Sequence, residues 1–137
     1  MRLVDDQTIG DTARGGTLAA SMGIEILTAT PERVVATMPV KGNTQPYGIL
    51  HGGASCVLAE TLGSIGAALH GARNGGKVAY GVDINATHHR AVRDGTVTGT
   101  ATPIHLGRTT ATYEIVITDE AGRRICTARL TCLLRDP

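Results

Sequence analysis

One long apolar stretch, residues 52–71, constrains the fold more than any other feature of the sequence. Its only acidic or strongly basic side chain is Glu60, and apart from His70 the other residues are small, apolar or hydroxyl-bearing. Such a length approaches that of a membrane span, but Glu60, Ser55, Ser64 and several glycines argue against a lipid environment. A helix that is apolar on all sides is usually buried, so we expect one long helix inside a folded core.

Shorter segments on both sides of this stretch predict β-strands. Alternation of apolar and polar residues is clear near the C-terminus and is typical of half-buried antiparallel strands. An economical way to bury one apolar helix is to wrap a curved antiparallel sheet around it. We therefore predict an α+β fold, with residues 1–14 as an irregular N-terminal segment and residues 15–137 as a single domain. A short helix is expected within residues 15–22, and strands are expected at residues 23–30, 33–40, 77–89, 96–105, 108–118 and 124–134.

Composition excludes several classes of function. The 137 residues carry a net charge of +1 and contain no Phe or Trp, which gives nucleic-acid binding little support. The cysteines are odd in number and lie in apolar segments without zinc-ligand spacing, so we expect reduced thiols and neither a metal nor another cofactor. No secretory signal peptide is recognisable. A cytoplasmic protein with no membrane or nucleic-acid partner is the expectation.

Glu60 is unusual because its helix offers it no basic neighbour. The residues four positions away are Cys56 and Ser64. A carboxylate buried without a partner is costly, and such groups are often catalytic. Two structural alternatives stay open: Glu60 meets an arginine from another strand or subunit, or it faces solvent.

The glycine pair at the start of the stretch suggests a second functional element. Amide groups at a helix N-terminus lack intrahelical partners, and at Gly52 a substrate carbonyl can approach the backbone closely. Gly52 and Glu60 are about 12 Å apart along a helix, too far to meet one reacting centre in a single chain. Two chains with antiparallel helices would bring the two groups together, so we predict a site shared across a dimer. Small residues are available for close helix packing at Ala59, Gly63, Gly66 and Ala67.

Three segments resemble hotdog-fold acyl-CoA thioesterases. They are residues 45–64 (QPYGILHGGASCVLAETLGS), residues 84–90 (INATHHR) and residues 103–108 (PIHLGR). The likeness is greatest to the group that hydrolyses hydroxybenzoyl-CoA and dihydroxynaphthoyl-CoA. The resemblance implies a hotdog fold, a homo-oligomer that is a dimer or a dimer of dimers (a homotetramer), and an acyl-CoA substrate with an aromatic acyl group favoured over an aliphatic one.

The resemblance also implies a role for each matching residue. Glu60 would be the catalytic carboxylate, acting as nucleophile or as general base on water. Gly52 would polarise the thioester carbonyl, Gln45 and His51 would orient the carbonyl and leaving group, and Ser64 would hold the carboxylate or the water. The coenzyme A arm would be bound by residues at strand ends, although such residues are often merely solvated: Gly81, His88, His89, Arg90, His105, Gly107 and Arg108.

Two other functions stay as alternatives. An acyl-CoA hydratase or dehydratase would use His51 and Glu60 for proton transfer at adjacent carbons. A non-catalytic acyl-CoA-binding module would retain the fold and lose the carboxylate. The helix carboxylate and the Gly-Gly pair after His51 favour thioester hydrolysis.

Overall fold

The computed structural model describes residues 15–137 and shows helices and strands in the predicted order. The short N-terminal helix covers only one turn, and the long helix extends two residues beyond the predicted end. The elements are α2 (Leu18–Ser21), β1 (Glu25–Thr30), β2 (Arg33–Pro39), α3 (Gly52–Arg73), β3 (Val78–His88), β4 (Thr96–Leu106), β5 (Thr110–Thr118) and β6 (Arg124–Arg135). The prediction for residues 1–14 lies outside the described residues.

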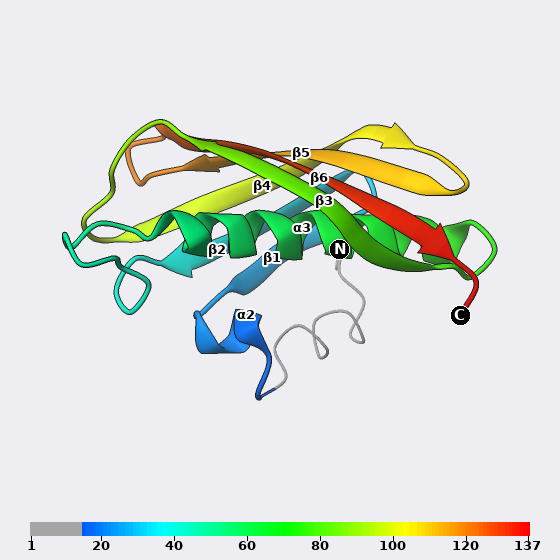
Figure 1. Ribbon diagram of the computed structural model, residues 1–137, viewed down its shortest axis with the longest axis horizontal. Helices are drawn as coiled ribbons and strands as arrows, with labels where there is room; N and C mark the ends of the chain where they lie inside the picture. Colours follow the sequence, from blue (N-terminus) through cyan, green and yellow to red (C-terminus); the bar gives the residue numbers. More distant parts are fainter. Residues whose placement is uncertain (1–14) are drawn as a thin grey trace.

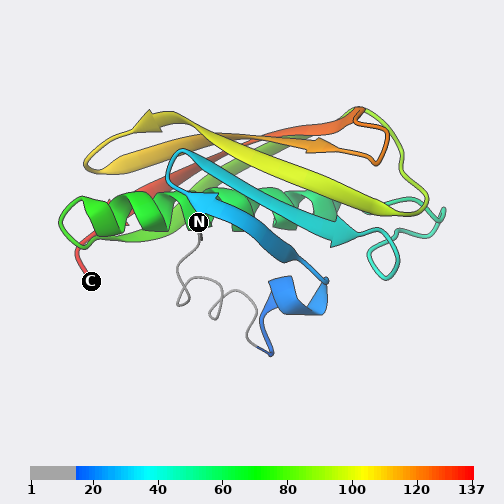
Figure 2. The same cartoon turned by 180° about the vertical axis from the view of Figure 1, so that it is seen from behind.

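The six strands form one antiparallel sheet in the order β1-β2-β4-β5-β6-β3. The sheet curves around α3, which runs along its concave side (Figures 1 and 2). Register shifts interrupt four of the strand pairs, among them one between Gly81 and Asp83 of β3 and one between Pro103 and His105 of β4. Such irregularities increase local twist and help a sheet to curl. The predicted hotdog fold is confirmed.

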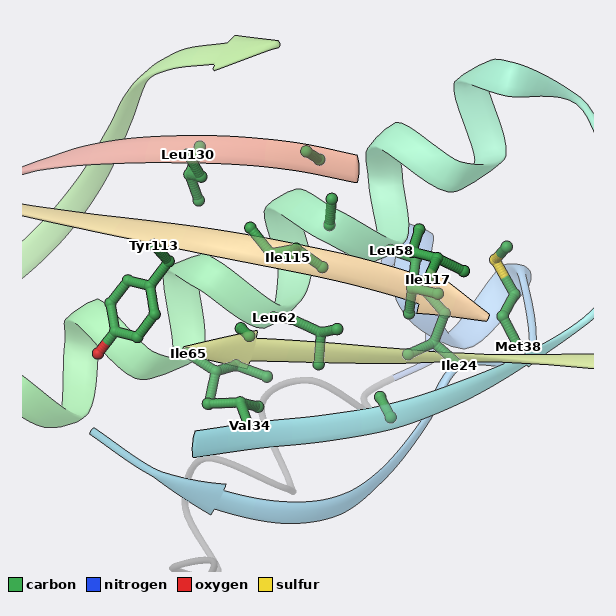
Figure 3. Packing of buried hydrophobic residues seen from close by; sticks show 14 of the residues in the cluster. Ile24, Val34, Met38, Leu58, Leu62, Ile65, Tyr113, Ile115, Ile117 and Leu130 are labelled. Carbon is green, nitrogen blue, oxygen red and sulfur yellow. The ribbon is translucent and has the colours of Figure 1, made fainter. Parts of the chain in front are cut away.

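The core lies between α3 and the sheet and consists mainly of aliphatic side chains (Figure 3). Tyr113 of β5 is the largest fully buried side chain, and its hydroxyl donates a hydrogen bond to the Pro31 carbonyl. The ring lies directly against Gly66 of α3, where an added Cβ would come within 2.6 Å of the ring carbon Cζ. This close approach requires glycine on the helix.

The small residues of α3 face the chain's own sheet, so the prediction that they pack against a partner helix is wrong. Ala59 and Ala67 are fully buried, and an added Cβ on Gly63 would come within 2.6 Å of a Leu130 methyl group. Bulky side chains on the sheet, such as Tyr113 and Leu130, occupy the space next to the helix. Small helix residues are therefore needed within one chain.

The opposite face of α3 is uncovered by the sheet, and Glu60 lies on it. Glu60 is exposed in the single chain. The expectation that it is buried is therefore wrong for one chain by itself, where the alternative that it faces solvent holds. The physical reason is that the sheet covers only one side of the helix. α2 lies beyond α3 on the side away from β4 and β5 (Figure 1). Although α3 is long and apolar enough to cross a membrane, half of its apolar stretch is buried inside the fold.

Candidate active site

The N-terminus of α3 has one backbone amide without an acceptor in the described part of the chain. Gly53 N–H donates to the His51 ring, and the N–H groups of Ala54 and Ser55 donate to the His51 carbonyl. Within residues 15–137, Gly52 N–H has no hydrogen-bond acceptor. The amide predicted to polarise a carbonyl is thus the free donor at the positive end of a 22-residue helix.

His51 caps α3 with its side chain. Its Nδ1 accepts a hydrogen bond of 2.8 Å from Gly53 N–H, and its backbone is extended, as is usual for an N-cap residue. A neutral imidazole that accepts at Nδ1 carries its proton on Nε2. The exposed edge of His51 is therefore a hydrogen-bond donor.

A cavity of about 330 Å³ adjoins this helix end and includes several predicted site residues. His88 lies across the helix N-terminus, because an added Cβ on Gly52 would come within 2.9 Å of its Nε2. His89 is held by a contact of 2.9 Å between its Nε2 and the Thr127 hydroxyl. The cavity is lined by Gln45, Ile49, Leu50, Gly52, Ser55, His88, His89, Arg90, Ala91 and Ile125.

Gln45 has its side-chain oxygen engaged within its own loop. That oxygen accepts from Tyr47 N–H, and the Gln45 carbonyl accepts from Gly48 N–H in a turn where Gly48 has a positive φ of 78°. The amide NH₂ group of Gln45 thus remains a donor beside the cavity. A donor here suits the predicted role of orienting a substrate carbonyl.

Glu60 and Ser64 line a different hollow, of about 370 Å³, on the uncovered face of α3. Residues of α2, including Leu18 and Ala19, form its other wall. The Glu60 carboxyl carbon lies 3.8 Å from the position that a Cβ on Gly81 would take, so β3 runs directly beside the carboxylate.

Two thiols lie near Glu60 and are kept protonated. Burial raises the pKa of Cys56, and the negative charge of Glu60 raises it further. The pKa of Cys132 is raised by burial and by Glu60, against the lowering effect of a hydrogen bond with Ser64. Neither thiol is suited to act as a nucleophile at neutral pH.

The remaining predicted coenzyme A residues lie at the other end of α3. His70, near that end, is within 2.7 Å of the Gly107 carbonyl through its Nε2, and its Nδ1 faces the Asn74 amide at 3.1 Å. Lys77 donates to the carbonyl of Arg108. Since His70 follows Gly52 by 18 residues, this turn lies about 27 Å along the helix from Gly52.

One chain therefore does not assemble the predicted site. Gln45, His51 and Gly52 lie together with His88, His89 and Arg90. Glu60 and Ser64 form a second group with Gly81, and the turn with His105, Gly107 and Arg108 forms a third. The described residues contain no group of three or more His, Cys, Asp or Glu side chains able to hold a metal ion.

Sequence reasoning missed Ser55 as a site residue. It lies three residues after Gly52, is only 2% exposed and lines the same cavity as Gln45. Residues three apart on a helix share a face, so the spacing from Gly52 was a usable signal. The apolar residues of the cavity wall, such as Ile49 and Ile125, carried no such signal.

Residues 47–126 match the thioesterase superfamily. The chain is 50% identical over 117 residues to the proofreading thioesterase EntH of Cronobacter turicensis, covering 85% of this chain and 84% of the relative. The crystal structure of thioesterase HI1161 from Haemophilus influenzae is similar with a TM-score of 0.87 and 39% identity, covering 97% of this chain and 92% of that one.

Two variant structures of SAV0944 from Staphylococcus aureus are also similar. One carries a Glu-to-Ala substitution and has a TM-score of 0.80 and 34% identity, covering 87% of this chain and 98% of that one. The other carries a Gln-to-Ala substitution and has a TM-score of 0.79 and 33% identity, covering 86% of this chain and 98% of that one. The second is described as a thioesterase enzyme. The fold, the matched segment and these relatives together establish that this chain belongs to the thioesterase superfamily and is a hotdog-fold thioesterase.

Proposed function

We propose that the protein hydrolyses an acyl-CoA to a free acid and coenzyme A at a site shared by two copies of the chain. In this site the Gly52 N–H of one copy polarises the thioester carbonyl, and Glu60 of the other copy is the catalytic carboxylate. The observation that carries the proposal is the amide of Gly52 at the α3 N-terminus, which has no acceptor within residues 15–137. Donors aimed at developing negative charge are a large source of rate enhancement in acyl transfer.

The β3 edge supports a shared site. Among the described strands, β3 ends the sheet and pairs only with β6. Its exposed side chains include Tyr80 (59% exposed) and Val82 (60%). An exposed strand of 11 residues with apolar side chains is a template for pairing with another strand. Antiparallel pairing of two β3 edges would set two α3 helices side by side in opposite directions and cover the exposed Glu60.

A matched pair of variants tests this arrangement. Val82→Lys places a charge on the β3 edge, and Leu27→Lys places one on β1 at the opposite edge, where Leu27 is 57% exposed. We expect Val82→Lys to become monomeric in light scattering and to lose thioesterase activity, and Leu27→Lys to keep both. A monomeric, fully active Val82→Lys variant would contradict the shared site.

Glu60 has two possible chemical roles, and we favour the nucleophile. Its carboxylate oxygen would attack the thioester carbonyl carbon, the carbon–sulfur bond would break, and the leaving thiolate would take a proton. Water would then hydrolyse the mixed anhydride and release the acid. In a single turnover in ¹⁸O-labelled water, this route puts label into Glu60 or the acid according to which anhydride carbonyl water attacks, whereas a general-base route labels only the acid.

Relatives support the choice of residues. In SAV0944 the two substituted positions, a Gln and a Glu, are 15 residues apart, the same separation as between Gln45 and Glu60. For this chain we expect Glu60→Gln to lower kcat by at least about 10³-fold with KM much less affected. A milder loss is expected for Gln45→Ala, because Gln45 only orients the substrate. Retained turnover in Glu60→Gln would refute the assignment.

The cap geometry of His51 disfavours a hydratase. Proton transfer at carbon would need a ring nitrogen free to accept a proton, but Nδ1 is bonded to Gly53 N–H and Nε2 carries the proton of the neutral ring. A donor suits the departing thiolate of a thioester instead. Incubation with an enoyl-CoA, with hydration and thiol release measured together, separates the two reactions.

The thiols of the chain bear on the cellular compartment in which the enzyme acts. Free Cys56, Cys126 and Cys132 fit a reducing compartment, so we propose action in the cytoplasm. We further propose a dimer of dimers and, among acyl groups, a preference for aromatic ones. A thiol-release assay with benzoyl-, phenylacetyl- and medium-chain acyl-CoAs tests the acyl preference.

A further inference from the structure

Ser55 is a buried polar residue in the first turn of α3. It is 2% exposed, and it lines the same cavity as Gly52 and Gln45. His51 already supplies the helix cap, so Ser55 is not needed for that purpose. Its position calls for another explanation.

The Ser55 hydroxyl has no hydrogen-bond partner among the described residues. A serine or threonine within a helix often donates to the carbonyl four residues earlier, as Thr61 does to Val57 at 2.7 Å. Ser55 makes no such bond. Because no fully buried side-chain oxygen in the described part of the chain lacks a partner, the small accessible area of Ser55 must include its hydroxyl. Ser55 lines the cavity, so the cavity is the side from which a ligand can reach this hydroxyl.

Gly52 and Ser55 are placed to bind one atom together. Residues three apart lie on the same helix face, about 4.5 Å apart along the axis, and Cβ leans toward the N-terminus, which brings the Ser55 hydroxyl closer to Gly52. One oxygen can accept from an amide at about 2.9 Å and from a hydroxyl at about 2.8 Å. Two donors one helical turn apart can therefore share one oxygen.

We propose that the Ser55 hydroxyl is a second hydrogen-bond donor to the thioester carbonyl oxygen, beside Gly52 N–H. This inference rests on the proposed function and extends it by a residue to which no role was assigned. Negative charge on that oxygen grows as the carbonyl is attacked, so the second donor contributes most in the transition state.

Ser55→Ala tests the proposal because it removes one oxygen atom and keeps the helix. We expect kcat to fall by about 10-fold to 10²-fold with KM little changed. Thr112→Val is the matched control: it removes another buried hydroxyl, which pairs with Thr131 on the sheet, and should leave kcat unchanged. Equal kcat losses in both variants would mean that the loss in Ser55→Ala comes from general destabilisation of the fold, and would overturn the proposal.

A binding measurement isolates the carbonyl contact. The probes are an acyl-CoA analogue with a methylene in place of sulfur, which keeps the carbonyl as a stable ketone, and the same analogue with the carbonyl also replaced by methylene. We expect Ser55→Ala to weaken ketone binding by roughly threefold to tenfold and to leave binding of the carbonyl-free analogue unchanged. Equal weakening of both, or of neither, would overturn the role of Ser55. Neither analogue is turned over, so this result is independent of the Glu60→Gln test of the proposed function.

Discussion

His51 combines a structural and a chemical role, and two substitutions separate them. The structural role is the 2.8 Å bond from Gly53 N–H to Nδ1, and the chemical role is the outward Nε2–H donor. His51→Ala removes both. His51→Asn keeps a side-chain oxygen suited to capping the helix and removes the ring donor.

The expected stability change follows from the cap. Gly53 is exposed, so water replaces the lost bond in His51→Ala, and we expect a loss of about 1 kcal/mol in the free energy of unfolding. For a domain of this size that corresponds to a fall of roughly 3–6 °C in Tm. His51→Asn should stay within about 0.5 kcal/mol of the parent protein, since Asn is a strong N-cap residue. Urea unfolding at equilibrium measures both values.

The expected activity change differs in pattern from the stability change. If Nε2–H of His51 stabilises the departing thiolate, both variants lose about 10-fold to 10²-fold in kcat, although only His51→Ala is destabilised. A thiol-release assay at 25 °C, where all three proteins are folded, gives the comparison. Because the Asn side chain keeps an NH₂ donor at a different position, recovery of full activity in His51→Asn would refute a specific role for the ring Nε2–H.

Three further predictions concern the nucleotide, the core and the thiols. Arg108→Ala should raise KM for an acyl-CoA several-fold and leave KM for the matching acyl-pantetheine unchanged, because only the former carries the phosphates that Arg108 is proposed to bind; an equal rise with both substrates would contradict that role. Gly66→Ala should destabilise the fold by about 1–3 kcal/mol in urea unfolding, since the added Cβ would meet the Tyr113 ring at 2.6 Å. Gly75→Ala is the control: no atom lies within 4 Å of the added Cβ, but φ is +86°, so only the smaller cost of the positive φ is expected. Burial raises the pKa of Cys126 to about 11 from a usual 9.0, and Cys56 adds to the rise. The folded protein therefore holds the thiol proton more tightly than the unfolded chain, so the free energy of unfolding should decline as pH rises from 9 to 11. Cys126→Val, which lacks the thiol, should show a weaker decline.

Local patterns in the sequence were sufficient to predict the helices and strands and an antiparallel sheet wrapped around one helix, whereas the hotdog fold was predicted from the family resemblance. Alternation along β5 and β6 reflects burial on one face of a sheet, and the long apolar α3 needed a cover. Strand ends differ from the prediction by one to two residues, since end residues such as Leu106 and Arg135 depend on pairing with a neighbouring strand. That pairing cannot be predicted from the residues of one segment alone.

The candidate site was predictable in its residues and not in its grouping. Glu60 was conspicuous as the one carboxylate on an apolar helix, but the same apolar pattern does not tell a face that meets the chain's own sheet from one left open. Gly63 and Gly66 therefore led to a wrong prediction of helix packing between chains. Ser55 was overlooked because a hydroxyl on a helix usually bonds to the backbone, and only the coordinates show that this one does not.

The central claim is that one active site takes Gly52 from one chain and Glu60 from its partner. Complementation measures this directly: inactive Glu60→Gln and inactive Gly52→Val are unfolded, mixed in equal amounts and refolded together. In a two-fold symmetric dimer, half of the products are mixed, and each mixed dimer has one site with both native residues, so activity should return to about a quarter of the parent value. Activity that stays at the level of the separate variants would mean that both residues act within one chain and would contradict the account.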